Sequence, residues 1–200
     1  MFRYSDHHAP TPAMTPENSP PPLIEVLPAT PEQEPVLANL LELYAHDFSE
    51  FIVRLGPDGR FGYPGLPLYL SEETRYPFLV KVDGELAGLV FVVRGSRITG
   101  DAKIWDMAEF FVVRRYRRRG VGAAVARKVW ERFPGPWEVR VVEGNEPAYA
   151  FWKAATRAFT NSAVQEHSTL IEGKRWSVFS FVSPPTPADG ADPGNPGHGE

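Results

Sequence analysis

The chain has 200 residues, contains no cysteine and carries a formal net charge of -4. This length allows one domain or at most two small ones, and the absence of cysteine excludes disulfides, thiolate metal sites and a cysteine nucleophile. The two ends of the chain carry the net negative charge, so its middle is neutral and gives no general bias toward nucleic acid. The start lacks the apolar stretch of a signal peptide, and no run approaches membrane-spanning length. We therefore expect a cytoplasmic protein with no membrane or nucleic-acid partner.

Both ends have the composition of disordered segments. Residues 1–22 and 184–200 hold more than half of the 21 prolines, beside Ser, Thr, Gly and Asn. Such segments bury too little apolar surface to offset the entropy lost on ordering. We expect two disordered tails around one folded domain at 23–183. No metal site is expected, because the adjacent His7 and His8 alone rarely suffice for one.

The first half of the domain reads as a strand followed by a helix and a long loop. Residues 23–27 are typical of a strand. The run Thr30-Pro31-Glu32-Gln33 predicts a helix start, with a capping residue, a proline in the first turn and a glutamine to close the capping box. Apolar residues at helical spacing continue to Phe51. Residues 55–70 read as a loop rich in Gly, Pro and aromatic residues, and 72–75 as the end of a short second helix.

A hairpin and an alternation of strands and helices follow. Two β-rich runs, 78–82 and 86–93, flank an Asp83-Gly84 turn and predict a hairpin. The later expected elements are a polar loop at 95–103, strands at 105–113 and 137–142, helices at 122–133 and 147–157, and a closing pair of strands at 163–171 and 176–182. This order predicts an α/β (α+β) fold, in which a mixed sheet carries helices on both faces.

The junction at Arg117–Gly122 is the most informative part of the sequence. It follows the apolar run 107–113, so a strand ends and a helix begins there. Glycines allow close backbone approach to a ligand, and the first N–H groups of a helix attract anions. Five arginines, at positions 114, 115, 117, 118 and 119, add positive charge. Together these features predict a phosphate cradle.

The sequence here resembles the GNAT superfamily of N-acetyltransferases, which bind acetyl-CoA. The turn Arg117-x-x-Gly120-x-Gly122 is similar to the family's pyrophosphate loop, and it follows the strand end 110–113 as in the family. The run 145–152, with Asn145, Ala148 and Phe151-Trp152, is similar to a second family segment that comes two elements later. The resemblance implies a mostly antiparallel sheet of six to seven strands, splayed in the middle and flanked by about four helices.

The resemblance also implies how acetyl-CoA, the co-substrate, is held. The backbone of 110–112 would pair with the pantetheine arm, N–H groups of 118–123 would hold the pyrophosphate, and Asn145 would bind pantetheine or fix the following helix. The implied binding residues are Phe110, Phe111, Val112, Val113, Arg117, Arg118, Arg119, Gly120, Val121, Gly122, Ala123, Asn145 and Trp152. A backbone N–H of Phe111 or Val112 would stabilise the oxyanion.

In such enzymes an amine attacks the thioester directly, and an alkyl amine with a pKa of ~10 must first lose a proton. Glu109 is the first candidate for the base, because it interrupts an apolar strand, and Asp106 is the second. A regular strand sends these two side chains to opposite faces unless a bulge intervenes. The alternative for Glu109 is an ion pair with an arginine such as Arg140.

The family usually has a tyrosine acid where this chain has Trp152, and indole has no useful acidic proton. Tyr149, one turn earlier, is the candidate substitute, although packing is the alternative role for it. A thiolate whose pKa is ~8.5 could also leave without an acid.

The acceptor site is expected to be built largely by residues 44–70, where His46 and Asp47 are candidates to face it. The acceptor could be a small amine, an amino acid, a peptide N-terminus or a protein lysine, and a homodimer is possible because many relatives dimerise. Two other functions stay open: an acyl-CoA-binding module without catalysis, and a nucleic-acid binder that uses Arg114–Arg119.

Overall fold

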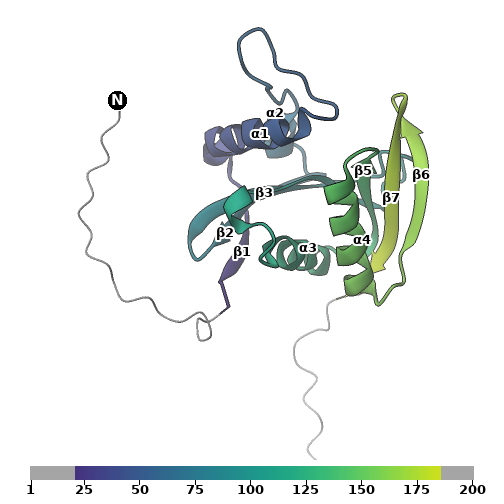
Figure 1. The fold of residues 1–200 in the computed structure, drawn as a ribbon. Coiled ribbons are helices and arrows are strands. Elements are labelled where there is room, and N and C mark those ends of the chain that lie inside the picture. The colour runs from purple at the N-terminus through teal and green to yellow at the C-terminus, as the bar shows by residue number, and fades with distance from the viewer. Residues whose placement is uncertain (1–20, 186–200) are drawn as a thin grey trace, which may run out of the picture.

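A computed structural model describes residues 21–185, and this part of the chain forms one seven-stranded sheet with four α-helices (Figure 1). The strand order is β1-β2-β3-β4-β5-β7-β6. Every neighbouring pair is antiparallel except β4 and β5, which run parallel. The mostly antiparallel sheet expected from the sequence is therefore confirmed. The expected disordered tails lie outside the described residues, apart from 21–22 and 184–185.

The first half of the domain follows the expected order with one correction. Its elements are β1 (Ile24–Pro28), the 3-10 helix η2 (Pro31–Gln33), α1 (Glu34–Phe48), α2 (Leu66–Ser71), β2 (Arg75–Val82), β3 (Glu85–Arg94) and β4 (Trp105–Val112). The capping box forms, since the backbone N–H of Thr30 donates to the side chain of Gln33 at 3.0 Å. The prediction that a short helix ends at residues 72–75 is wrong. The helix comes earlier, because Leu66 and Tyr69 are buried under it, and β2 already begins at Arg75.

The second half agrees closely with the sequence expectation. Its elements are the 3-10 helix η3 (Arg114–Tyr116), α3 (Val121–Arg132), β5 (Gly135–Val142), α4 (Glu146–Thr160), β6 (Gln165–Ile171) and β7 (Lys174–Ser183). The predicted pairing of the last two strands is confirmed. Asn161, at a left-handed φ of 50°, ends α4 three residues later than the expected end at Arg157.

The helices cover both faces of the sheet, and α1 with α2 lie on the face opposite α3 and α4 (Figure 1). The strand β3 is buried on both sides because its side chains alternate between two cores. Leu89 and Phe91 pack in the core under α1 and α2. Val90 and Val92 pack in the core under α3 and α4. Both cores therefore reach β4, the neighbour of β3 and the strand that carries the candidate base.

The sheet splays between β4 and β5. These parallel strands pair only near their starts, at Trp105↔Trp137 and Asp106↔Glu138, and separate beyond that point. The remaining length of β4 pairs only with β3. The expected splay in the middle of the sheet is thus confirmed, and the second half of β4 has a backbone edge that β5 does not cover.

A bulge lies in β4 just before this edge. Phe91 pairs with Glu109 while the next residue, Val92, pairs with Met107, so Ala108 is the extra residue on β4. The bulge changes the alternation and brings Asp106 and Glu109 to the walls of one cavity. The bulge that the sequence required for this arrangement is therefore present.

Candidate active site

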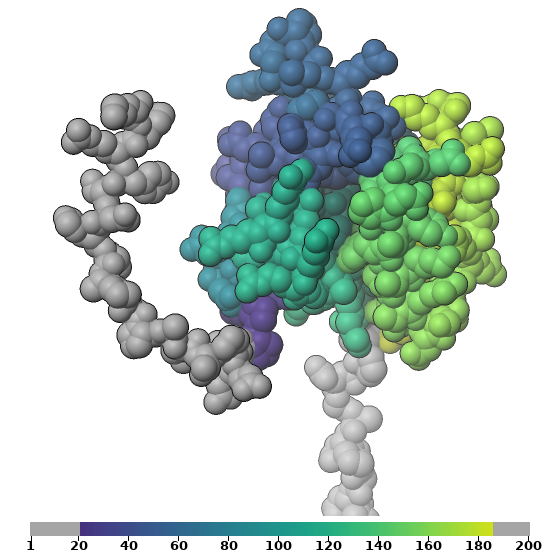
Figure 2. Space-filling view, viewed as in Figure 1, coloured from purple at the N-terminus to yellow at the C-terminus, as the bar shows by residue number. Residues whose placement is uncertain are grey.

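A cavity of about 910 Å³ opens where β4 and β5 diverge. In the space-filling view the surface is hollowed between the start of α3 and the green α4, close to α1 (Figure 2). The end of α1, the end of β4, the turn before α3 and the start of α4 form its walls. The lining residues are Tyr44, Asp47, Phe48, Glu50, Phe51, Phe110, Phe111, Val112, Arg114, Arg117, Arg118, Gly120, Gly122, Ala123, Asn145, Pro147, Ala148, Phe151 and Trp152.

The turn before α3 presents its backbone to this cavity. Gly120 caps the helix with a left-handed φ of 77°, a conformation that favours glycine. An added Cβ there would meet no atom within 4 Å, so the space beside the turn is open. The first N–H groups of α3 have no partner inside the helix and carry the positive end of its dipole. This geometry fits a diphosphate, and Gly122 and Ala123 of the first helical turn also line the cavity.

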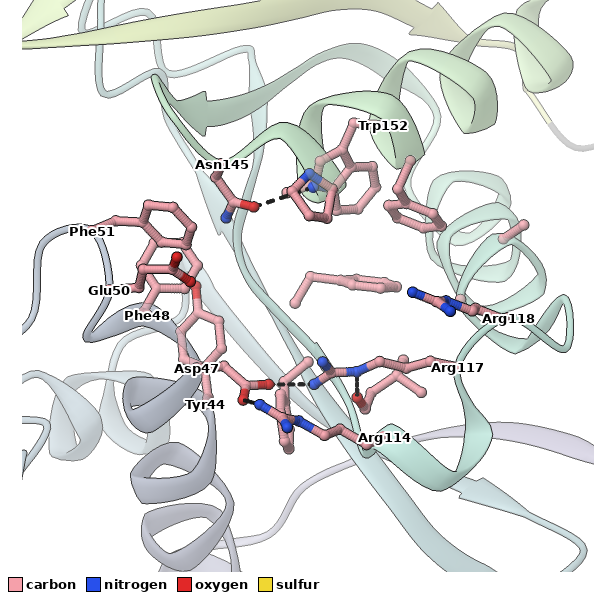
Figure 3. A pocket seen from close by; sticks show the side chains of 18 of the residues that line it. Tyr44, Asp47, Phe48, Glu50, Phe51, Arg114, Arg117, Arg118, Asn145 and Trp152 are labelled. Atoms are coloured by element: carbon pink, nitrogen blue, oxygen red, sulfur yellow. Dashed lines mark hydrogen bonds and ion pairs between the residues drawn. The ribbon is translucent and has the colours of Figure 1, made fainter.

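Two arginines of the turn are tied to α1. Arg117 and Arg114 donate to the two carboxylate oxygens of Asp47, at 2.5 Å and 2.8 Å (Figure 3). Arg117 also donates from Nε to the backbone oxygen of Val112 at 2.6 Å. Burial opposes the ionisation of Asp47, but the bonds from both arginines outweigh it and hold the pKa of this carboxyl below its ordinary value. The end of α1 is thereby fixed to the candidate phosphate loop.

The backbone N–H groups of β4 beside the cavity point alternately toward β3 and toward the splayed side. The N–H of Val113 donates to the carbonyl of Ala87 in β3 at 2.8 Å. Because N–H directions alternate along a strand, the N–H of Phe111 also faces β3, and those of Phe110 and Val112 face the splayed side. Of the two donors expected for the oxyanion, Phe111 or Val112, only Val112 has its N–H on that side. The expectation for the Phe111 amide is therefore wrong.

The start of α4 forms the opposite wall. The side-chain oxygen of Asn145 accepts from the N–H of Ala148 at 3.2 Å, so this residue caps the helix while lining the cavity. Trp152 is only 6% exposed and packs edge-on against Phe110, with ring centroids 4.9 Å apart. A Cβ on Gly122 would come within 3.2 Å of the Phe151 ring. The cavity is therefore closed at its base by tightly packed aromatic rings.

Tyr149 lies away from this cavity. Its hydroxyl donates to Glu166 of β6 and accepts from Lys153 at 2.9 Å. Its ring packs against Phe179 of β7, with centroids 5.6 Å apart. Tyr149 is not among the lining residues, so the structure favours the packing role that the sequence left open for it.

Three expected binding residues also lie outside the cavity lining. Val121 is 2% exposed and belongs to the core under α3. Val113 packs toward the core under α1. Arg119 is exposed, next to Gly120, but its side chain does not reach the cavity wall. Their side chains therefore do not line the cavity, although the backbone of Arg119 and Val121 belongs to the turn.

A second cavity, of about 600 Å³, lies beside the β4 bulge. It is formed by the loop before α2, the start of β2, the β3–β4 connection and the middle of β5. Its lining residues are Tyr63, Pro64, Gly65, Tyr69, Arg75, Val93, Gly95, Ser96, Arg97, Asp106, Ala108, Glu109 and Arg140. The expected acceptor region at 44–70 thus contributes walls to both cavities.

Glu109 belongs to the second cavity and adjoins two residues of the first, Tyr44 and Phe110. It lines the second cavity and accepts a hydrogen bond from the hydroxyl of Tyr63 at 2.7 Å. The hydroxyl of Tyr44, which lines the first cavity, also interacts with this carboxyl group. Burial raises the pKa of Glu109 above its ordinary value, while both tyrosines and Arg140 act in the opposite direction. A carboxyl group with a raised pKa in the wall of a cavity is suited to accept a proton.

Asp106 and Glu109 have different hydrogen-bond partners. Arg140 of β5 donates two hydrogen bonds to Asp106, at 3.1 Å and 2.6 Å, and both side chains are almost fully buried. The alternative of a direct ion pair between Glu109 and Arg140 is therefore wrong, because Arg140 directs both of these hydrogen bonds to Asp106. Asp106 is committed to a bidentate ion pair, whereas Glu109 has only neutral hydroxyl donors.

Several residues of the site are not identified by the sequence. Tyr44 and Tyr63 read only as members of an aromatic cluster, and Arg75 and Arg97 carry no motif. Their spacing from Glu109 along the chain gives no signal, and only the tertiary packing of α1, the loop before α2, β2 and the β3–β4 connection brings them near it. Of the two polar candidates in α1, Asp47 lines the first cavity, whereas His46 lines neither and lies edge-on to Phe61 at 6.4 Å.

Comparison with known proteins decides the family. A sequence profile described as "Acetyltransferase (GNAT) family" matches residues 37–155. The chain belongs to the GNAT acetyltransferase family. Comparison with curated protein sequences gives no significant match. Across residues 21–185 of this GNAT protein, no helix has both the length and the hydrophobicity needed to cross a bilayer.

Solved structures of low sequence identity share the fold. An acetyltransferase from Thermus thermophilus is 17% identical over 80% of this chain and 96% of its own, with a TM-score of 0.59. A GNAT-family acetyltransferase from Streptococcus pneumoniae is 18% identical over 80% and 99% of the two chains, with a TM-score of 0.53. Spermidine N-acetyltransferase from Vibrio cholerae, solved with CoA and spermine, is 11% identical over 80% and 95%, with a TM-score of 0.57. At these identities the likeness concerns the fold.

Proposed function

We propose that this GNAT protein transfers an acetyl group from acetyl-CoA to a primary amine, with both substrates bound at the same time. The observation that carries the proposal is the position of Glu109 in the wall of the second cavity, next to Tyr44 and Phe110 of the first cavity, which has a turn suited to phosphate in its wall. Acetyl-CoA supplies the acetyl group as a reactive thioester. The amine would enter the second cavity and meet the acetyl group beside Glu109.

The residues of the first cavity would hold the co-substrate. The N–H groups around Gly120 face the open space that suits a diphosphate. The backbone of Phe110 and Val112, directed to the splayed side of β4, would pair with the pantetheine arm as an added strand does. Asn145 caps α4 and shapes the wall where this arm would pass. The Val112 N–H is the donor that we assign to the oxyanion.

Glu109 is the proposed general base. The substrate ammonium gives one proton to the Glu109 carboxylate, and the neutral nitrogen then forms a bond to the acetyl carbonyl carbon. The carbon–sulfur bond breaks, its electron pair goes to sulfur, and the second nitrogen proton is transferred to the departing thiolate. The products are the amide and the CoA thiol, and one proton reaches solvent when Glu109 ionises again. A thiol with a pKa of ~8.5 leaves without a dedicated acid, so Trp152 does not prevent the reaction.

A panel of amines incubated with acetyl-CoA tests the proposal, with release of free thiol as the measurement. We expect amine-dependent thiol release and the acetylated amine as product. Tight CoA binding without release for any amine would instead support the alternative, an acyl-CoA-binding module without catalysis. That alternative is favoured by Trp152, which replaces the family tyrosine, and by the engagement of Tyr149 with Glu166.

A further inference from the structure

The second cavity has a chemical character that narrows the acceptor, and the following inference rests on the proposed function. Its volume of about 600 Å³ lies in the range of small-molecule sites. Tyr63, Pro64, Tyr69 and Val93 supply apolar and aromatic surface to its wall. The rings of Tyr63 and Tyr69 lie 6.2 Å apart and form one continuous aromatic side. The lining is more polar than apolar overall, and this aromatic side is the part of the wall against which an apolar group of a small molecule can pack.

The charged residues that line the second cavity comprise one compensated pair and three further groups. The buried pair of Asp106 and Arg140 is internally compensated by two hydrogen bonds. Glu109 then remains as the carboxyl group that can bind the amine of the acceptor. The other charged lining residues are Arg75 and Arg97, both cationic. An acceptor that fills this cavity meets one carboxyl group and two guanidinium groups.

Arg75 is positioned along the aromatic wall. Its guanidinium lies 5.0 Å from the centroid of the Tyr69 ring. Its Nε donates to Glu72 at 2.6 Å, but Glu72 does not line the cavity. Arginine has five N–H donors in a rigid fork that matches a carboxylate. Its bonds to Glu72 and Tyr69 therefore leave further N–H donors able to bind an anion inside the cavity.

Arg97 lies on the β3–β4 connection, which is anchored by hydrogen bonds of a buried residue. The neighbouring Ser96 is buried, and its hydroxyl donates to Glu138 at 2.7 Å while accepting from the N–H groups of Ile98 and Thr99. Arg97 contacts Glu172 only at 3.6 Å, between two highly exposed side chains. Exposed pairs of this kind contribute little, so a carboxylate in the cavity could replace Glu172 as the partner of Arg97.

We propose that the acceptor is a free amino acid with an apolar side chain, whose amine meets Glu109 and whose carboxylate meets Arg75 and Arg97. The aromatic wall takes the side chain. A polyamine does not fit this pattern, because its second ammonium group would lie beside the two arginines and repel them. The acceptor class would thus differ from that of the spermidine N-acetyltransferase that shares the fold.

The test compares three amines that share one aromatic group and differ at the carboxylate, with spermidine added as a polyamine. We would measure kcat/KM for phenylalanine, phenylalaninamide, phenethylamine and spermidine. Each value would be divided by the fraction of that amine that is unprotonated at the pH of the assay. We expect phenylalanine to exceed each of the others at least tenfold. Equal or better turnover of phenethylamine or spermidine would overturn the amino-acid assignment while acetyl transfer stands. No turnover of any amine would overturn the proposed function itself.

A charge reversal locates the carboxylate. We expect Arg97→Glu to raise the ratio of the KM for phenylalanine to the KM for phenethylamine at least tenfold. Lys103→Glu, on the same β3–β4 connection and outside the cavity lining, is the matched control and should leave this ratio as it is in wild type. Calorimetric titration with phenylalanine provides a second measurement that does not depend on turnover. Equal phenylalanine binding by wild type and the Arg97 variant would contradict the assignment of Arg97.

Discussion

Glu109 combines three features of a general base in one residue. It is half-buried, it accepts a hydrogen bond from Tyr63, and it lies on the wall of a cavity. Burial and the nearby Glu109 carboxyl raise the pKa of the Tyr63 hydroxyl, so this hydroxyl remains a hydrogen-bond donor. The orientation of the carboxyl group is thus determined by neutral donors, and no cation lowers its basicity through a direct ion pair.

The first prediction concerns turnover. We expect Glu109→Gln to lower kcat about 100-fold near neutral pH, as for loss of a general base. The loss should shrink as the pH approaches the pKa of the acceptor amine, at most ~10 for an alkyl amine, because the free amine needs no base. Steady-state kinetics across the pH range provide the measurement. A loss that does not change with pH would assign Glu109 to packing.

The second prediction concerns stability. Because burial raises the pKa of Glu109 in the folded state, the fold holds this proton more tightly than the unfolded chain does. The stability that the protonated group contributes is complete below the unfolded pKa of ~4.3 and is lost as the pH rises through the folded value. Glutamine does not ionise, so the Glu109→Gln variant does not lose this stability as the pH rises. We therefore expect its melting temperature, relative to wild type, to increase from pH 4 to pH 8, by about 3–5 °C per unit of pKa shift. A constant difference across this range would contradict the raised pKa.

The third prediction concerns the buried ion pair of Asp106 with Arg140. Removing one partner of a buried ion pair leaves the other charge uncompensated, which typically costs about 3–5 kcal/mol. We expect Asp106→Asn to lower the free energy of unfolding by this amount in denaturant titrations. Turnover per folded molecule should fall much less than in Glu109→Gln. If the Asp106 variant folded normally but lost turnover, Asp106 would replace Glu109 as the base.

At the scale of elements, the start of α3 is the feature on which the proposed co-substrate binding depends. Gly120 and Gly59 both have a φ of 77°, and neither has an atom within 4 Å of an added Cβ. Substitution at either position therefore carries similar backbone strain. Only Gly120 lines the first cavity, so Gly59 offers a matched control for that strain.

We expect Gly120→Glu to abolish CoA binding in isothermal titration calorimetry, because the new carboxylate would occupy the place proposed for the diphosphate. Gly59→Glu should bind CoA as wild type does. Circular dichroism would verify that both variants fold. Wild-type affinity in the Gly120 variant would remove the basis for placing the diphosphate at α3.

At the scale of the whole molecule, the splayed sheet separates into two parts. The two pairs at the starts of β4 and β5 are the direct strand contact between β1–β4 and β5–β7. The first cavity has walls from both parts, with Asp47 and Val112 on one and Asn145 and Trp152 on the other. A ligand that fills it would therefore connect the two parts of the sheet.

We expect CoA at 100 times its Kd to stabilise the fold by about 2.7 kcal/mol and to slow hydrogen exchange in both the α3 start and the α4 start. Adenosine 3′-phosphate 5′-diphosphate, which keeps the diphosphate and lacks the pantetheine arm, is the matched ligand. It should slow exchange at α3 and leave α4 unchanged. Protection limited to α3 with full CoA would contradict a pantetheine path along Asn145.

Local chemistry explains what the sequence predicted correctly. The Asp83-Gly84 turn, the capping residues at Thr30 and Gln33, and the left-handed Gly120 all depend on neighbours within a few positions. The misplaced second helix has the opposite cause. Its position depends on burial of Leu66 and Tyr69 against distant strands, which no local pattern encodes.

The order of elements, the turn at Gly120 and the family likeness were determined by the amino-acid sequence, because each rests on short-range backbone preferences and on one contiguous motif. Three features were decided only by the tertiary structure: the pairing of Arg140 with Asp106, the set of tyrosines around Glu109, and the arginines that line the same cavity as Glu109. The physical reason is that the first two features join residues more than 30 positions apart, and the third brings separate segments of the chain to one cavity. Strand register and the β4 bulge, and not spacing along the chain, bring them within reach of one another.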